Sequence, residues 1–180
     1  MMLREILNAK DPRLREVSKP VKAIDKKIKA LVKDLKDTLV VQKDPEGVGL
    51  AAPQIGKNVR VFVMMPEKEI KVVINPEIVS LVTKKSVKDK PEPKGKRIME
   101  GCLSLPHYYG PIARIKKIVL NYLSEDGNEK KETFEGMDAQ IIQHEIDHLN
   151  GVLFIDRLFE QKKPLYEYRD GEWEQVDLPL

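Results

Sequence analysis

The sequence has a single cysteine among its 180 residues, no long apolar run and no strong excess of charge of either sign. One cysteine cannot form an internal disulfide, so nothing in the chain requires an oxidising compartment. No segment approaches the roughly 18 consecutive apolar residues of a membrane-spanning helix. The first residues include an early acid, Glu5, and no apolar segment, which is unlike a secretory signal or a transit peptide. We therefore expect a cytoplasmic protein with no membrane partner.

The charged residues are balanced and dispersed. There are 32 Lys and Arg against 29 Asp and Glu, a formal net charge of +3, without the basic stripe of a dedicated nucleic-acid binder. We expect no direct nucleic-acid substrate. The length and the 41% share of hydrophobic residues suit one globular domain over residues 1–180.

The most informative stretch is His144-Glu145-Ile146-Asp147-His148, which holds two of the three histidines. Positions four apart lie on one face of a helix, so both imidazoles can reach one ion. Glu145 lies beside that ion and can act as a general base. Cys102 is a candidate third ligand, which would leave one of four tetrahedral positions open, as catalytic metals do. The alternatives are an inert buried thiol at Cys102 and a structural role for His107.

The pattern along the chain predicts an α+β fold. Ile24, Ile28, Leu31, Leu35 and Leu39 recur at three- or four-residue steps and predict an N-terminal amphipathic helix over about 25–42. The motif helix is expected over about 138–150, with Gly151 as its stop. Short β-branched runs predict strands at 59–65, 71–74 and 78–82, joined by turns at Pro66 and at Asn75-Pro76. A hairpin of 115–123 with 129–134 is also predicted. These closely spaced strands favour antiparallel sheets around the motif helix.

Two stretches lack such a pattern. Residues 83–96 are rich in Lys, Pro and Glu and are predicted to form a long surface loop. The tail, residues 161–180, is polar and aromatic without clear periodicity, and its role is not readable from the sequence.

Two apolar residues of the motif helix share a face with its histidines. Met137, Ile141, His144 and His148 follow one another at steps of four, three and four. This spacing predicts a hydrophobic pocket beside the metal, and ordinary core packing of Met137 and Ile141 is the alternative.

Three segments together resemble the peptide deformylase family. They are Gly47–Gln54, Glu100–Pro106 and Gln143–Leu149, in the family's order and at similar separations. Asp11–Arg15 and Gly151–Asp156 are also similar to it, so the resemblance covers most of residues 5–160. It implies a hydrolase that removes the formyl group from the N-terminal formylmethionine of newly made polypeptides and releases formate.

The resemblance also implies a ligand set and a mechanism. Cys102, His144 and His148 would hold one divalent metal ion, iron(II) in the cell, with nickel, cobalt or zinc able to replace it. Water would take the fourth position and attack the formyl carbonyl, with Glu145 as general base and then acid. The side-chain amide of Gln54 and the backbone N–H of Leu103 would stabilise the oxyanion with the metal.

By the same resemblance, the substrate is held as an added strand, which accepts many downstream sequences. The implied backbone contacts are those of Val48, Gly49 and Gly101. Ile98, Met137 and Ile141 would lie near the methionine side chain, and Glu100 would be a buried acceptor near the pocket. The expected partners are N-formylmethionyl nascent peptides, with transient proximity to the ribosome.

The chain departs from the family's pattern after the cysteine loop. Many members carry an arginine a few residues beyond it, whereas this chain has His107-Tyr108-Tyr109-Gly110 and its first arginine at Arg114. This leaves open the charge pairing that such an arginine supplies to Glu100 or to the peptide. Residues 83–96 are also expanded, and the acidic, aromatic tail is not the long basic helix that would favour a ribosome contact.

Two other functions remain open from the residues alone. A zinc metallopeptidase also uses HExxH, but commonly takes its third ligand from a downstream His or Glu rather than from an upstream cysteine. A non-catalytic binding module with a structural zinc, or with none, would not need Glu145.

Overall fold

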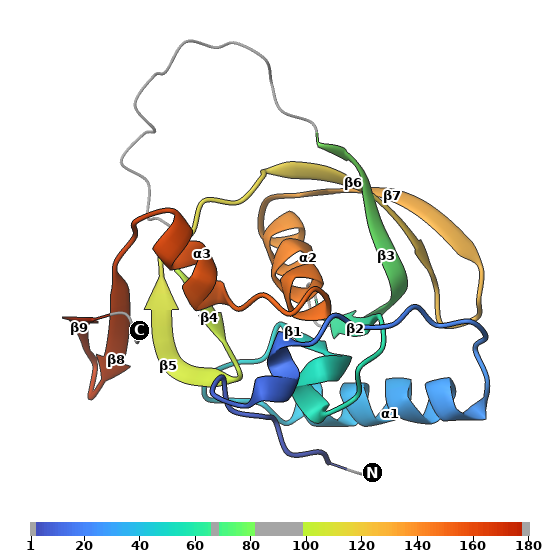
Figure 1. Ribbon diagram of the computed structural model, residues 1–180, viewed down its shortest axis with the longest axis horizontal. Helices are drawn as coiled ribbons and strands as arrows, with labels where there is room; N and C mark the ends of the chain where they lie inside the picture. Colours follow the sequence, from blue (N-terminus) through green and yellow to red (C-terminus); the bar gives the residue numbers. More distant parts are fainter. Residues whose placement is uncertain (1–2, 66–68, 82–98, 178–180) are drawn as a thin grey trace.

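The computed structural model describes residues 3–65, 69–81 and 99–177 (Figure 1). The predicted surface loop 83–96 and Ile98 lie outside these residues. The elements follow in the order η1 (Pro12–Arg15), α1 (Lys26–Val40), β1 (Gly49–Ala51), η2 (Ala52–Ile55), β2 (Val61–Met64), β3 (Lys71–Leu81), β4 (Glu100–Cys102), β5 (Leu105–Gly110), β6 (Lys117–Leu123), β7 (Glu129–Glu135), α2 (Gly136–Leu149), α3 (Phe154–Glu160), β8 (Leu165–Arg169) and β9 (Glu172–Val176). Among the residues described, no helix has both the length and the apolar character needed to cross a membrane.

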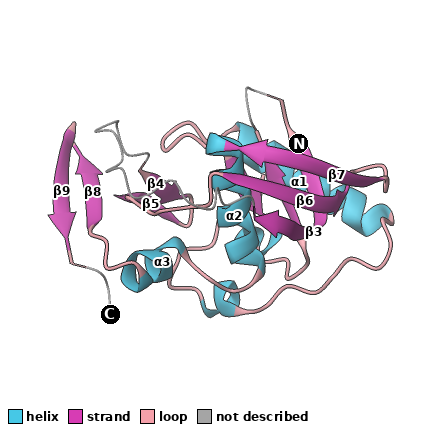
Figure 2. Cartoon of the chain, turned by 90° about the horizontal axis from the view of Figure 1, so that it is seen from above, coloured by secondary structure: helices cyan, strands magenta, loops and turns pink. Residues whose placement is uncertain are grey.

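All strand pairs of the two sheets are antiparallel. The larger sheet has the order β1-β2-β3-β6-β7 and the smaller one the order β4-β5-β8-β9. Helix α2 lies in the middle of the molecule between the two sheets (Figures 1 and 2). This α+β arrangement leaves β1 and β4 as edge strands of their sheets.

Strand β2 is buried on both faces, because a helix covers each of them. Val61 and Val63 pack in one core cluster with Leu35 of α1. Phe62 alternates with them and packs in a second cluster with Ile142 of α2. Alternate side chains of a strand point to opposite faces, so a continuous apolar run is what this position requires.

Helix α1 occupies the range predicted from the periodicity. Asp25 caps its N-terminus, and its Oδ1 accepts hydrogen bonds from the backbone N–H groups of Lys27 and Ile28, each at 2.9 Å. Leu35 and Leu39 are fully buried on the inner face.

The strands predicted at 71–74 and 78–82 are one strand, β3, so the turn expected at Asn75-Pro76 was wrong. The pairing of β3 with β6 shifts register between Ile74 and Glu77, and Asn75 adopts a φ of 50°. The Asn75 side chain accepts from the backbone N–H of Val21 and donates to its carbonyl, each at 2.8 Å. The pair therefore forms a β-bulge, where a strand tolerates proline.

The tail has more structure than its sequence suggested. Residues Leu165–Val176 form the β8–β9 hairpin, joined by Asp170-Gly171 with φ values of 53° and 86°. An Asp-Gly pair with both φ values positive is a common two-residue hairpin turn. The sequence analysis did not predict this hairpin, although the Asp-Gly dipeptide is a signal that could have indicated it.

A substitution on each face of α1 tests its packing. We expect Leu35→Ala to lower the free energy of unfolding by about 2–5 kcal/mol, because it leaves a cavity at a fully buried position. Lys29→Ala, on the exposed face, should change it by less than about 0.5 kcal/mol. Urea unfolding at equal metal content measures both, and equal effects would contradict the assignment of faces.

Candidate metal centre

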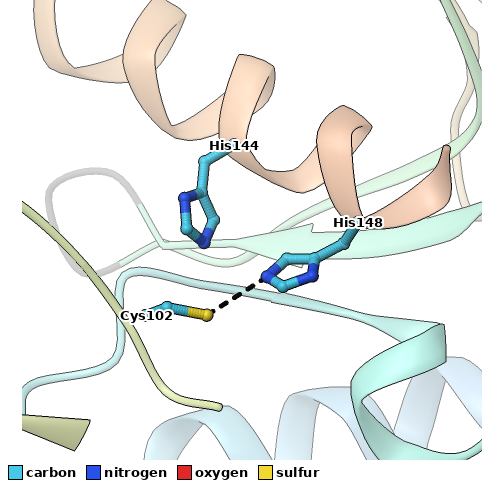
Figure 3. A group of neighbouring side chains, drawn as sticks. All are labelled: Cys102, His144 and His148. Carbon is cyan, nitrogen blue, oxygen red and sulfur yellow. Dashed lines mark hydrogen bonds between the residues drawn. The ribbon is translucent and has the colours of Figure 1, made fainter. Parts of the chain in front are cut away.

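Three metal-binding side chains converge from two elements. His144 and His148 lie one turn apart on α2, and Cys102 ends β4. Their ligand atoms lie within 4.8 Å of one another, and all three residues are buried. In Figure 3 the three side chains point toward a common centre, with Cys102 Sγ 3.3 Å from His148 Nε2.

The chemistry of these donors fits a divalent metal ion. One thiol and two imidazoles are a ligand set of zinc and of first-row transition metals. Burial raises the pKa of the Cys102 thiol, but the charge of His148 and hydrogen bonds from His144 and His148 outweigh it and lower the pKa well below its usual value. The cysteine is therefore disposed toward the thiolate form that binds metals.

The outer nitrogen of His144 is held by a buried carboxylate. His144 Nδ1 lies 2.8 Å from Glu100 Oε1, which fixes the ring with Nε2 toward the centre. Arg114 donates to both oxygens of Glu100, from Nη2 at 2.7 Å and from Nε at 3.0 Å. Burial raises the pKa of Glu100, but hydrogen bonds from His144 and Arg114 lower it to about 2. Arg114 therefore makes the charge pair with Glu100 that the sequence left open.

The same ion network reaches α3. Arg114 Nη1 donates to Asp147 Oδ2 at 2.6 Å, and Arg157 donates to both oxygens of Asp147, at 2.6 and 3.0 Å. Asp147 thus faces two arginines, and Arg114 links it to Glu100 and so to His144. Removing one member of such a buried network typically costs about 3–5 kcal/mol.

Unlike Glu100 and Asp147, Glu145 forms no ion pair that would offset its burial among the residues described. It is 3% exposed, its Oε2 has no hydrogen-bond partner among the residues described, and burial raises its pKa to about 7. Gly49 of β1 leaves room for this carboxylate, since a Cβ there would lie 2.3 Å from Glu145 Oε1. A buried carboxyl with a pKa near neutrality suits proton transfer.

Gln54 is buried beside Cys102 and held in one orientation. Its Oε1 accepts from the backbone N–H of Ala51 at 2.9 Å. Its Nε2 then donates to Ser104 Oγ at 3.2 Å and lies 3.7 Å from Cys102 Sγ. The amide therefore presents its N–H groups toward the metal ligands.

A pocket of about 300 Å³ opens beside these groups. The predicted site residues that line it are Val48, Gly49, Gln54, Glu100, Gly101, Cys102, Leu103, Met137, Ile141, His144 and Glu145. Val48 and Met137 are 41% and 48% exposed, whereas Ile141 is buried. Both oxygens of Glu100 are bonded within the protein, and Ile98 lies outside the described residues.

Further residues line the pocket that the sequence did not single out for it, among them Gln140 and Tyr109. Gln140 lies four residues before His144 on α2, so helical spacing could have found it. Tyr109 comes from β5, and no local spacing connects it to the motif helix.

The class of protein that such a pocket defines is the metal-dependent hydrolases, in which a buried carboxylate works beside a metal with an accessible position. The polypeptide deformylase family model matches residues 3–164. A peptide deformylase of Rhodopseudomonas palustris is 41% identical over 172 residues, 92% of this chain and 91% of that protein. One of Pseudothermotoga lettingae is 40% identical over 92% of each chain. The chain therefore belongs to the polypeptide deformylase family.

Solved structures agree with this membership. A peptide deformylase from Legionella pneumophila superimposes with a TM-score of 0.73 at 41% identity, over 87% of this chain and 86% of that one. A peptide deformylase from Synechococcus elongatus, in complex with actinonin, gives a TM-score of 0.74 at 33% identity, over 86% and 78% of the two chains.

Metal retention tests the role of Cys102. We expect Cys102→Ala to weaken metal affinity by at least about 100-fold. Loss of a group that only hydrogen-bonds to a metal ligand already lowers metal affinity by about 10- to 100-fold. His107→Ala is the control, since the half-exposed third histidine is not among the three converging ligands. Metal content after dialysis against a chelator measures both, and unchanged metal in Cys102→Ala would remove this residue from the site.

Proposed function

We propose that the chain removes the formyl group from the N-terminal formylmethionine of newly made polypeptides and releases formate. The observation that carries the proposal is a buried Glu145 carboxylate whose Oε2 has no hydrogen-bond partner among the described residues. It lines one pocket with Cys102 and His144, which converge with His148. The family match over residues 3–164 supports the same reaction.

Cys102, His144 and His148 would hold one divalent metal ion, and we propose iron(II), although the donor set also suits nickel, cobalt and zinc. When bound, the ion would lower the pKa of a water molecule and polarise the carbonyl of the substrate. Glu100 keeps His144 oriented for this task, with Arg114 neutralising the carboxylate.

Glu145 moves the proton. Glu145 lines the pocket, and its carboxylate, whose Oε2 has no hydrogen-bond partner among the described residues, can accept a proton from the attacking water. The same carboxyl can then deliver that proton to the amine nitrogen as the bond to the formyl carbon breaks. Formate and a free N-terminus are the products.

Gln54 and Leu103 stabilise the negative charge that develops on the formyl oxygen. The Gln54 amide is already oriented by Ala51 and Ser104, so it needs no reorganisation during the reaction. Leu103 follows Cys102 directly, and its backbone N–H is the second proposed donor.

The edges of the two sheets provide a place for the peptide backbone. Strands β1 and β4 are both edge strands, and Gly49 of β1 and Gly101 of β4 line the pocket. An extended substrate can hydrogen-bond to such an edge, with Val48 continuing the contact. Met137 and Ile141 then lie beside the methionine side chain. We also assign Ile98, which is outside the described residues, to this pocket.

We further propose that residues 1–180 act as one catalytic domain, to whose smaller sheet the tail contributes strands β8 and β9. A thiolate ligand at Cys102 favours a reducing compartment, which supports action in the cytoplasm on nascent peptides near the ribosome.

Formate release from formyl-Met-Ala peptides by anaerobically prepared, metal-loaded protein tests the function. We expect turnover by the unaltered protein and a loss of at least about 100-fold in Glu145→Ala, because general acid–base catalysis typically contributes 10²- to 10⁴-fold. Metal analysis on the same samples should show the ion retained. New internal termini in unformylated peptides would instead indicate a metallopeptidase, and full activity of Glu145→Ala would contradict the mechanism.

The oxyanion role of Gln54 has a separate test. We expect Gln54→Ala to lower kcat by about 10²- to 10³-fold, the usual effect of removing one oxyanion donor. Ser104→Ala keeps the amide and removes only its hydrogen-bond partner, so it should cost less than about tenfold. If kcat of Gln54→Ala stays within about twofold of the unaltered protein, Gln54 is not a donor.

A further inference from the structure

The N-terminal segment is hydrogen-bonded to both sides of the metal centre. Residues 4–9, which we call the strap, form no helix or strand (Figure 1, dark blue). The backbone N–H of Leu7 donates to the carbonyl of Gln54, which belongs to η2, at 2.8 Å. The backbone N–H of Ala9 donates to the carbonyl of Ser104, in the turn between β4 and β5, at 2.7 Å. The strap therefore joins the two segments that carry the proposed oxyanion donors.

No strand pairing joins these two segments among the described residues. Helix η2 follows β1, an edge strand of the larger sheet, and the β4–β5 turn follows β4, an edge strand of the smaller sheet. A side-chain contact also spans this gap, from Gln54 Nε2 to Ser104 Oγ at 3.2 Å. A glutamine side chain has several rotatable bonds, so this contact holds only while the two backbones keep their spacing.

The short strap can set that spacing. Two N–H groups that lie two residues apart in a chain are at most about 7 Å from each other. The carbonyls of Gln54 and Ser104 therefore cannot move apart without breaking one of the two bonds to the strap. Both acceptor residues are only 1% exposed, so these bonds lie in the interior, where a lost partner is costly.

The strap is itself fixed at both ends. The backbone N–H of Arg4 donates to Thr38 Oγ1 of α1 at 3.0 Å. The carbonyl of Asn8 accepts from the backbone N–H of Asp11, the N-cap of η1, at 2.8 Å. Between these ends, Ile6 packs against the core cluster of α1. The strap is thus part of the folded core and not a loose tail.

We propose that Leu7 and Ala9 are positioning residues for the deformylation reaction. They hold η2 and the β4–β5 turn at the spacing in which the Gln54 amide and the Leu103 N–H face one oxyanion. This role rests on the proposed function, because these donors are the ones assigned to formyl hydrolysis. Oxyanion donors act fully only when their positions are fixed in advance, so loss of the spacing lowers kcat rather than substrate affinity.

Removal of single N–H groups from the backbone tests this role. Replacing Leu7 by its α-hydroxy acid turns the N–H into an ester oxygen and keeps the side chain. In the full-length, metal-loaded protein we expect this ester to lower kcat for formyl-Met-Ala peptides by about two- to ten-fold, the effect of one hydrogen bond, with KM within about twofold. The same ester at Ala9 should also lower kcat. The matched control is an ester at the exposed Ala23, outside every described helix and strand, which should leave kcat unchanged.

A double-mutant cycle separates positioning from general stability. The Leu7 ester should lower kcat of the unaltered protein but not that of Gln54→Ala, because the position of η2 no longer matters once the amide is absent. A bond that only stabilises the fold would lower kcat by the same factor in both backgrounds. Metal content and urea unfolding are measured on all four proteins of the cycle.

The two esters test the two bonds separately, so a variant that does not fold leaves the other one to decide. Unchanged kcat, an equal loss of kcat in the Gln54→Ala background, or a rise in KM alone would overturn the positioning role. In each of these cases the unaltered protein still releases formate, and the proposed function stands. Absence of formate release by the unaltered, metal-loaded protein would overturn the proposed function itself.

Discussion

The structure depends on burying polar groups of one helix. His144, Glu145, Asp147 and His148 of α2 are all less than 9% exposed, although each would be better solvated in water. Asp147 is paired with Arg114 and Arg157, and His144 with Glu100. These partners come from β4, from the segment after β5 and from α3, so pairing the buried polar groups of one helix requires all three segments to be in place.

The buried acidic groups around α2 differ in whether an arginine is paired with them, and the proposed chemistry depends on this difference. Glu100 and Asp147 are paired with arginines, and the pKa of Glu100 is lowered to about 2. Among the described residues no cation is in hydrogen-bond contact with Glu145, and burial raises its pKa to about 7. Three acidic groups near one helix thus have different roles because their environments differ. The same burial leaves Glu145 Oε2 without a hydrogen-bond partner among the described residues, a cost that the proposed catalytic role would explain.

The sequence predicted the elements whose signals are local and missed those that depend on pairing. Helix α1 and the β6–β7 hairpin occur close to the expected ranges, because side-chain periodicity and turn residues act within a few positions. Asn75-Pro76 was predicted to be a turn. In the structure it is a bulge within β3, held by the hydrogen bonds with Val21 and by the pairing with β6. The β8–β9 hairpin went unrecognised, since its strands are largely exposed and carry only a weak apolar alternation.

By itself the sequence indicated His144 and His148 as candidate metal-binding groups, because a spacing of four residues places two histidines on one face of any helix. It could not determine that Arg114 would neutralise Glu100, that Gly49 would make room for Glu145, or that Tyr109 would meet Trp173. Those contacts join residues 14, 96 and 64 positions apart along the chain. Only the tertiary structure decides them, because such contacts depend on how strands pair and on which faces the two sheets turn toward α2.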